Sequence, residues 1–351
     1  MTGPPSLSFS LTALAVVISL VYSGASITNN EYDCHLTHIK VPVILDQSTV
    51  RLQSPEFTAD NLSELGVLCV IECQRKLPKP RPSELERLLS YETVYENGTR
   101  TFTKIKLEGV TGLRNASSSV VCKAGHFKRR KRHVYGMDGH FVITDKHFIT
   151  NYPFSASVKL STGCSGILVS PKHVLTSAHC VHDGQVYLKG TKRLRVGVMK
   201  EHRRTRKNHI RRDTDSDQAG REVSADYDYA LLELKRPHKM KFMELGIVPV
   251  VKGIPAGRIH FSGFDNDQLG KVVYRFCSVL EESNDLMYQY CDVQKGSSGA
   301  GVYVIGVFSG HQLVDVDGMQ KDYNVAVRIT PAKYTQICHW IHGDASQCKL
   351  A

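Results

Sequence analysis

The stretch Leu175-Thr-Ser-Ala-His-Cys180 closes a β-rich segment that starts at Cys164, and it sets a histidine beside a cysteine directly after an apolar run. Far downstream, Gly296-Ser-Ser-Gly-Ala-Gly301 lies between two runs that are typical of strands. Between these stretches lies Asp226-Tyr-Asp-Tyr-Ala-Leu-Leu232. One chain therefore carries a histidine, an aspartate and a serine in that order, with the serine inside a glycine-rich turn.

The start of the chain predicts export. In a chain of 351 residues with 41% hydrophobic residues, Leu11–Tyr22 is an apolar run too short to cross a bilayer comfortably. The small residues Ser23-Gly-Ala25 follow it, as in a secretory signal cut after Ala25. The alternative is an amphipathic start to the mature domain. After removal of the signal, we expect no membrane span.

Cysteines and glycosylation motifs agree with an extracellular location. Three sequons, at Asn61, Asn97 and Asn115, all lie before residue 120 and predict a glycosylated, surface-rich N-terminal region. An even number of cysteines stands on each side of residue 132, which fits disulfide pairing within each part: Cys34, Cys69, Cys73 and Cys122, then Cys164, Cys180, Cys277, Cys291, Cys338 and Cys348.

The net charge of +11 is concentrated in two basic runs, residues 128–132 and 203–212. Arg129-Arg-Lys-Arg132 resembles the target of secretory-pathway proprotein convertases, so we expect cleavage after Arg132. The second run is typical of a solvated loop, with binding to an extracellular polyanion as the alternative. No zinc-finger spacing or aromatic stacking motif accompanies the charge, which excludes nucleic acid as an expected partner.

The part before Arg132 predicts a small α+β unit. Residues 26–73 show little periodicity. Ser83-Glu-Leu-Glu86 forms a capping box that predicts a short helix through Leu89. Residues 93–96 and 99–107 predict a hairpin, with Asn97-Gly98 supplying the positive φ angles of its turn.

After His133 the pattern changes to short apolar runs separated by Gly, Pro, Asn and Asp, which predicts an all-β barrel or sandwich. The expected strands are 157–160, 166–169, 194–198, 230–234, 258–261, 302–305 and 324–327. At the end, Thr330 is the expected cap of a helix with Pro331 in its first position, and Tyr334, Ile337, Cys338 and Ile341 share one face of it.

These motifs resemble the chymotrypsin-fold serine proteases throughout residues 133–351. The resemblance rests on the runs that contain Cys164, His179, Asp228 and Gly296–Gly299, on Phe261-Ser-Gly-Phe264, and on the terminal Tyr334-Thr-Gln-Ile-Cys-His-Trp-Ile341. Chymotrypsin-type enzymes carry their triad in the chain order His, Asp, Ser. The implied fold is mainly β, a chymotrypsin-like double antiparallel β-barrel of two six-stranded barrels, with the active site between them and a C-terminal helix.

The expected organisation is therefore a signal peptide at 1–25, a glycosylated α+β pro-region at 26–132 and a trypsin-like protease domain at 133–351. Cys164 and Cys180 form the expected disulfide that pins the strand presenting His179, worth about 3 kcal/mol by loop closure. Cys277 with Cys291 and Cys338 with Cys348 are the next expected pairs.

The chemistry that the resemblance implies needs a base for a serine hydroxyl, which is a poor nucleophile near neutral pH. His179 is the expected base, Asp228 the carboxylate that orients it, and Ser298 the nucleophile. Asp226 is the alternative carboxylate. The backbone N–H groups of Gly296 and Ser298 form the expected oxyanion hole. Taken alone, His179 could equally be a buried core histidine, and Gly296-Ser-Ser-Gly299 could be an ordinary flexible loop.

Some positions depart from the family pattern. Most members carry aspartate where Ser297 stands, and that carboxylate binds the new amino terminus after activation, which in this chain would be His133. The resemblance also suggests Asp292 as a selector of Lys or Arg, with a structural carboxylate as the alternative, and Ser309 as part of the edge that pairs with the substrate backbone. His126, His133, His140 and His147 lack flanking ligands, so we expect neither a metal site nor a cofactor.

We therefore expect a secreted serine endopeptidase acting on protein or peptide substrates, processed by a proprotein convertase. The alternative is a catalytically weak protease-fold binding protein of the extracellular space. Inactive relatives in this family have lost the serine, so the presence of Ser298 favours the enzyme.

Overall fold

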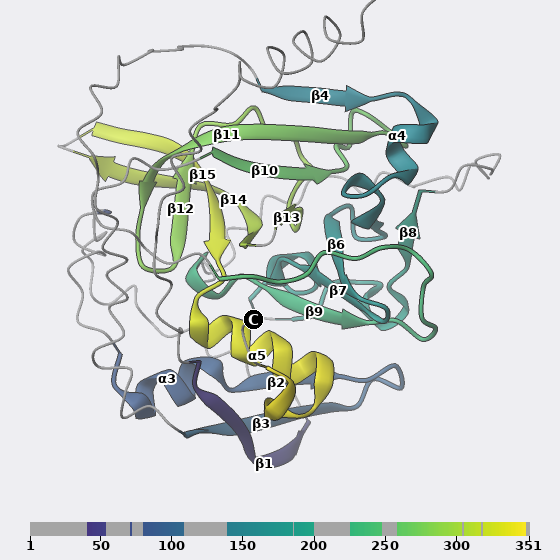
Figure 1. The fold of residues 1–351 in the computed structure, drawn as a ribbon. Coiled ribbons are helices and arrows are strands. Elements are labelled where there is room, and N and C mark those ends of the chain that lie inside the picture. The colour runs from purple at the N-terminus through teal and green to yellow at the C-terminus, as the bar shows by residue number, and fades with distance from the viewer. Residues whose placement is uncertain are drawn as a thin grey trace, which may run out of the picture. The chain divides into compact units, whose positions relative to one another are not determined.

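The computed structural model describes residues 41–53, 71, 80–108, 139–184, 186–199, 225–247, 258–303, 305–316 and 319–348 (Figure 1). Several expected features lie outside the described residues. These are the signal segment, the sequons Asn61 and Asn115, the cleavage site at Arg132, and the basic run at 203–212. Among the described residues, no helix is long and apolar enough to span a bilayer.

A three-stranded antiparallel sheet forms before the protease-like region, with strands in the order β1-β3-β2. The predicted hairpin is confirmed as β2 (Tyr91–Val94) and β3 (Arg100–Glu108). In its turn Gly98 has φ +82°, and the Asn97 carboxamide accepts a hydrogen bond from Thr99 N–H. The edge strand β1 (Val43–Leu52) was not predicted, because in this strand only Ile44 is buried and its sequence lacks a clear apolar alternation.

The predicted short helix is confirmed as α3 (Pro82–Leu89), but its expected capping box is wrong. The helix starts two residues earlier than a capping box at Ser83 would place it, because Pro82 occupies a first-turn position and Arg81 is the N-cap, without a side-chain capping bond. The carboxylate of Glu86 accepts instead from the N–H of Leu107 on β3, at 2.9 Å. Glu86 therefore ties the helix to the sheet.

The first sheet of the protease-like region has five antiparallel strands among the described residues, in the order β8-β5-β6-β7-β9 (Figure 1). Its strands are β5 (Ser157–Leu160), β6 (Ser165–Ser170), β7 (His173–Thr176), β8 (Val196–Val198) and β9 (Ala230–Glu233). Every residue of β6 is buried. The central strands thus form the core from which the His179 segment emerges.

In the described ranges, the second sheet has seven strands in the order β10-β13-β14-β15-β12-β11-β4. A further pairing of β10 with β11 closes six of them into a barrel. The strands are β4 (His140–Ile143), β10 (Arg258–Gly263), β11 (Val272–Glu282), β12 (Leu286–Gln289), β13 (Gly301–Val302), β14 (Gly306–Val316) and β15 (Met319–Arg328). This confirms the chymotrypsin-like architecture. The expected strand list omitted β4, β7, β11, β12 and β14.

Short helices connect the strands. They are α4 (Lys146–Thr150) and the 3-10 turns η3 (Phe154–Ala156), η4 (Ala178–Cys180), η5 (Thr191–Arg193), η6 (Ala225–Tyr227) and η7 (Ala345–Gln347). Two of them matter for the site, because η4 carries His179 and η6 precedes Asp228.

The terminal helix is confirmed as α5 (Pro331–His342), with the Thr330 hydroxyl accepting from Lys333 N–H and Gly343 ending the helix at φ +68°. Gln336 on this helix donates to the carbonyl of Leu89, and His339 lies 3.1 Å from a carboxylate oxygen of Asp46. Helix α3 and strand β1 are therefore each joined to the C-terminal helix by a polar contact. Disulfides join Cys338 to Cys348 and Cys277 to Cys291, as expected.

Candidate active site

His179 lies in the tight turn that follows β7, where the chain leaves the buried core of the first sheet. The preceding Thr176 and Ser177 are completely buried. The Cys164–Cys180 disulfide, with Cα atoms 6.0 Å apart, links the next residue to the start of β6, and it confirms the expected pair. The backbone that carries His179 is thus anchored on both sides.

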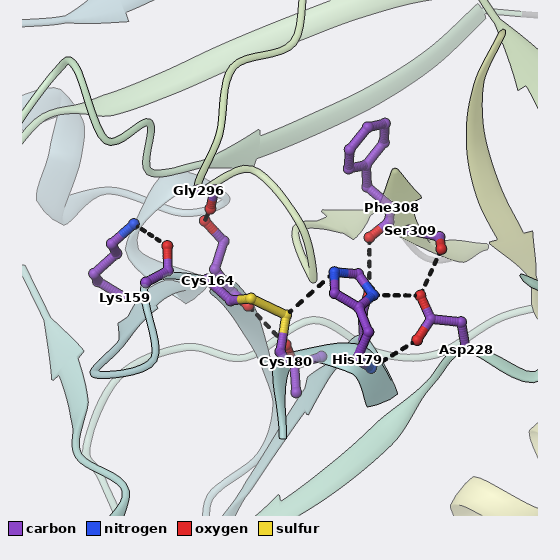
Figure 2. The surroundings of a disulfide bond; sticks show 12 residues. Lys159, Cys164, His179, Cys180, Asp228, Gly296, Phe308 and Ser309 are labelled. Atoms are coloured by element: carbon purple, nitrogen blue, oxygen red, sulfur yellow. Dashed lines mark hydrogen bonds and ion pairs between the residues drawn. A yellow bond between two sulfur atoms is a disulfide. The ribbon is translucent and has the colours of Figure 1, made fainter. Parts of the chain in front are cut away.

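Asp228 lies between η6 and β9, and its side chain is almost entirely buried. One carboxylate oxygen, Oδ1, accepts the backbone N–H of His179 at 2.9 Å. The other, Oδ2, lies 2.7 Å from Nδ1 of the His179 ring and accepts the hydroxyl of Ser309 at 2.5 Å (Figure 2). Both carboxylate oxygens therefore accept hydrogen bonds, and these bonds orient the imidazole of His179.

These contacts raise the pKa of His179 and lower the pKa of Asp228, and both shifts favour a charged histidine beside a charged carboxylate. Burial opposes protonation of His179, but the hydrogen bond to Asp228 and the charge of that carboxylate outweigh burial and raise the pKa of the ring above its ordinary value of 6.5. Burial alone would raise the pKa of Asp228; its bonds with His179 and Ser309 and the histidine charge lower it instead.

The contact with Asp228 also decides which ring nitrogen acts as a base. Because an ionised carboxylate only accepts hydrogen bonds, Nδ1 of the neutral ring carries the hydrogen and Nε2 keeps its lone pair. Nε2 points toward the Cys164–Cys180 disulfide, 3.9 Å from Sγ of Cys180 (Figure 2). His179 therefore presents its basic nitrogen away from Asp228.

The glycine turn that contains Ser298 is bound to the segment before His179. Gly299 N–H and the Ser177 hydroxyl both donate to the carbonyl of Phe308, each at 2.8 Å. A Cβ on Gly299, whose φ is +81°, would lie 2.1 Å from Oγ1 of Thr176. Only glycine allows this approach, which places Ser298 beside the chain that leads to His179.

Two backbone N–H groups of the turn have no acceptor within the part of the chain that the structure describes. Ser297 N–H donates to Gln294 at 3.2 Å, whereas the N–H groups of Gly296 and Ser298 donate to no acceptor among the described residues. Gly296 has φ +105°, and its carbonyl accepts the Ser165 hydroxyl at 2.7 Å. The N–H groups of Gly296 and Ser298 are the pair expected to form an oxyanion hole.

Ser298 itself is partly exposed, and within the described part of the chain its hydroxyl makes no hydrogen bond to Nε2 of His179. Its carbonyl accepts the N–H of Ser165 at 2.8 Å. The structure therefore forms the pair of His179 and Asp228, and brings the Ser298 backbone next to it without the third hydrogen bond.

The other sequence-predicted residues fall in different places. Among the described residues, Asp226 makes no hydrogen bond or ion pair with His179; burial and the neighbouring Asp285 raise its pKa to about 6. Asp292 is exposed, and its carboxylate pairs with Nδ1 of His140 at 3.1 Å. Asn97 is exposed at the hairpin turn. Cys164 and Cys180 lie with His179 in a cluster of metal-binding residue types, but their sulfurs are bonded to each other.

Sequence reasoning missed the roles of two serines at the site, Ser309 and Ser165. Ser309 was expected at the edge that pairs with the substrate backbone, but its hydroxyl donates to the carboxylate of Asp228. Ser309 lies at a bulge of β14. Ser165 bonds the turn through both its N–H and its hydroxyl. Single serines in strands give no signal of such contacts, because only the fold brings them to their partners.

Comparison with known proteins relates this chain to the trypsin class of proteins. The trypsin family matches residues 142–275, a stretch that contains both His179 and Asp228. A solved structure of a Glu endopeptidase in complex with MPD matches with 20% identity and a TM-score of 0.41, over 58% of this chain and 97% of that chain.

The relatives narrow the class to one family. Human inactive serine protease 35 is 49% identical over 88% of this chain and 92% of its own length. Human serine protease 23 is 43% identical over 99% of this chain and 100% of its own length. The chain belongs to the chymotrypsin-fold serine protease family that includes serine protease 23 and inactive serine protease 35, as the sequence motifs predicted.

Proposed function

We propose that the protein is a secreted serine endopeptidase that hydrolyses peptide bonds with Ser298 as nucleophile, His179 as general base and Asp228 as the carboxylate that orients the base. The observation that carries this proposal is the pair of bonds from Asp228 to His179, one to the ring at 2.7 Å and one to the backbone at 2.9 Å. A structural carboxylate needs neither this tautomer nor this orientation.

The reaction follows from these positions. As the Ser298 oxygen attacks the carbonyl carbon, its proton passes to Nε2 of His179, and the oxyanion forms hydrogen bonds with the N–H groups of Gly296 and Ser298. The tetrahedral intermediate breaks the carbon–nitrogen bond, and Nε2 donates its proton to the leaving amine. Water, deprotonated by the same nitrogen, then hydrolyses the acyl-enzyme and restores Ser298.

The missing bond between Ser298 and His179 forms, in this proposal, when substrate binds. Catalytic hydrogen bonds in substrate-free structures are often long and tighten in the substrate complex. What supports this step is that the Ser298 backbone is already held by Ser165, and that the next residue, Gly299, packs against Thr176.

We also propose that the chain is made as a precursor, with a signal at 1–25, a pro-region at 26–132 and a protease domain at 133–351. A proprotein convertase would cut after Arg132, and glycans would occupy Asn61, Asn97 and Asn115. The exposed position of Asn97 at a hairpin turn supports the second of these glycans. Extracellular polyanions remain a proposed partner of the basic run at 203–212.

The specificity role of Asp292 is a separate proposal. Its side chain is exposed, and its carboxylate lies 3.1 Å from Nδ1 of His140. If it selects a cationic side chain before the scissile bond, Asp292→Asn abolishes a preference for Lys or Arg in a peptide library. A wild-type enzyme without that preference removes this role and leaves Asp292 as a partner of His140.

The competing function is a binding protein that keeps the protease fold without hydrolysis, and the names of several relatives, inactive serine protease 35, favour considering it. The two are separated by hydrolysis of a quenched fluorescent peptide library by the Arg132-cut protein. We expect turnover that Ser298→Ala removes. Turnover equal in wild type and Ser298→Ala, or absent in a wild type shown to be folded, supports the binding protein.

A further inference from the structure

A completely buried ion pair lies behind the Ser298 turn. Arg275 on β11 and Asp265, in the loop after β10, are 1% and 3% exposed. The two side chains form a bidentate pair, in which Nη1 of Arg275 donates to Oδ1 of Asp265 at 3.1 Å and Nη2 donates to Oδ2 at 2.5 Å. Burying such a pair removes both charges from water, so it is costly unless geometry and further hydrogen bonds compensate.

The further hydrogen bonds reach the catalytic turn. The hydroxyl of Ser297, which is 0% exposed, donates to Oδ1 of Asp265 at 2.6 Å and accepts from Nη1 of Arg275 at 3.2 Å. Ser297 is the residue directly before Ser298. Its hydroxyl is therefore enclosed by both members of the ion pair.

The same cluster also fixes the backbone before the turn. Nε of Arg275 donates to the carbonyl of Asp292 at 2.5 Å, and the N–H of Asn266, next to Asp265, donates to the carbonyl of Lys295 at 2.8 Å. In a trans peptide the C=O and N–H groups point in opposite directions. Since the Lys295 carbonyl points to Asn266, the N–H of Gly296 points away from it.

From these contacts we propose that Arg275 and Asp265 are positioning residues that hold the Gly296–Ser298 turn in its catalytic conformation, through Ser297 and the backbone. The inference rests on the proposed function of Ser298. The anchors that involve the ion pair come from residues 265–297, and the others come from Ser165 and Phe308, so all of them lie after residue 133. The turn therefore needs no new amino terminus at His133, and it is already held in the uncut chain.

The test compares Arg275→Lys and Ser297→Ala with a matched control, Arg328→Lys. Arg328 is also a buried arginine, 3% exposed and paired with Glu282 at 2.6 Å, but it has no contact with the turn among the described residues. In the full-length chain we measure hydrogen exchange of the Ser297, Gly299 and Ala300 amides. We expect exchange at least tenfold faster in the two test variants and unchanged in the control.

The link to catalysis is measured as the rate of fluorophosphonate labelling of Ser298 and as kcat and KM on a peptide ester. Arg275→Lys and Ser297→Ala should lower labelling and kcat at least tenfold, with KM within about twofold of wild type. The control Arg328→Lys should keep the wild-type labelling rate and kcat, even where it lowers Tm as much as the test variants do. Equal effects in all three variants overturn the positioning role, since general destabilisation then explains them.

Two further outcomes are decisive. A chain with Arg129–Arg132 replaced by alanine should protect the turn amides as well as the cut chain does; protection that appears only after cleavage overturns the proposal. If wild-type Ser298 is never labelled, the proposed function fails, and the exchange comparison alone then confirms or rejects the positioning role of Arg275.

Discussion

At Asp228, one buried carboxylate accepts three hydrogen bonds, from the ring and the backbone of His179 and from Ser309. Hydrogen bonds to a charged group contribute more than neutral ones, about 1.5–3 kcal/mol each. The negative charge is therefore held in place by the residues it serves. This arrangement gives the imidazole a fixed tautomer before any substrate arrives.

The raised pKa of His179 predicts the pH dependence of hydrolysis. The base must be neutral, so kcat/KM should rise with pH through an apparent pKa above 6.5. Asp228→Asn removes the charge while burial remains, so the apparent pKa should fall, and the rate should drop by about 10⁴, the figure established for chymotrypsin-type triads. A pH–rate profile in both proteins checks this, and an unchanged pKa in the variant would contradict it.

The same pKa shift affects stability with a definite sign. Because the folded state binds the His179 proton more tightly, protonation stabilises the fold at pH values below the ordinary pKa of 6.5. This contribution disappears as the pH rises through the raised pKa. The site is thus most stable with a charged histidine and active with a neutral one.

Ser309→Ala removes one of the three donors to Asp228. Loss of one bond to a buried charge should lower kcat between about tenfold and a hundredfold, with little change in KM. Ser262→Ala is the matched control, since Ser262 is also buried but bonds to Ser157 and Tyr303. Steady-state kinetics of both variants decide it; equal losses in the two would show that Asp228 does not depend on Ser309.

Among the elements, the two disulfides at Cys164–Cys180 and Cys338–Cys348 close loops of similar length, with separations of 16 and 10 residues. Loop-closure entropy gives each about 3 kcal/mol of stabilisation. Only the first lies next to His179. Comparing the loss of each disulfide therefore distinguishes a general effect on stability from a specific effect on the His179 site.

Cysteine-to-serine replacement of either disulfide should lower the free energy of unfolding by about 3 kcal/mol, measured by urea denaturation. Hydrolysis, measured at a temperature where both variants are folded, should fall only when Cys164 and Cys180 are replaced. Unchanged hydrolysis in that variant would mean that η4 holds His179 without the disulfide.

The sequence predicted the elements whose local chemistry is strong. The Asn97-Gly98 hairpin and the helix that begins at Thr330 were predicted because each depends on residues next to one another. Strand β1 was not, because its pairing with β3 joins residues far apart and its side chains stay largely exposed. Glu86 misled for the same reason, since its partner, Leu107, lies on another element.

Across the whole chain, the sheet of residues 43–108 packs on α5. Ile44 and Leu89 are completely buried in a cluster that includes Ala332 of the helix, and Tyr91 meets Trp340 edge-on at 5.3 Å between ring centroids. Apolar burial of this kind does not depend on a continuous chain. The described residues of this N-terminal segment therefore have an apolar contact surface of their own on α5.

We predict that residues 43–108 stay bound after cleavage at Arg132, even with disulfides reduced. Gel filtration of the cut protein should show both pieces in one peak. Trp340→Ala should release the N-terminal piece, whereas His342→Ala, an exposed position on the same helix, should not. Separate elution of the wild-type pieces would contradict the prediction.

The sequence motifs were enough to predict the contact between His179 and Asp228, which are 49 positions apart, because the segment around each residue is typical of the family. The same motifs said nothing of the Arg275–Asp265 pair, in which an arginine inside a strand meets an aspartate in a loop. Buried ion pairs depend on the register of β10 and β11, and single residues do not reveal that register.

The central claim is that Ser298 becomes a nucleophile through His179, and its most direct test is active-site labelling. The Arg132-cut protein is treated with a fluorophosphonate, digested, and its labelled peptide is identified by mass spectrometry. We expect one label on Ser298, lost in Ser298→Ala and slowed at least a thousandfold in His179→Ala. A folded protein that takes up no label at Ser298, or takes it up equally fast without His179, contradicts the claim.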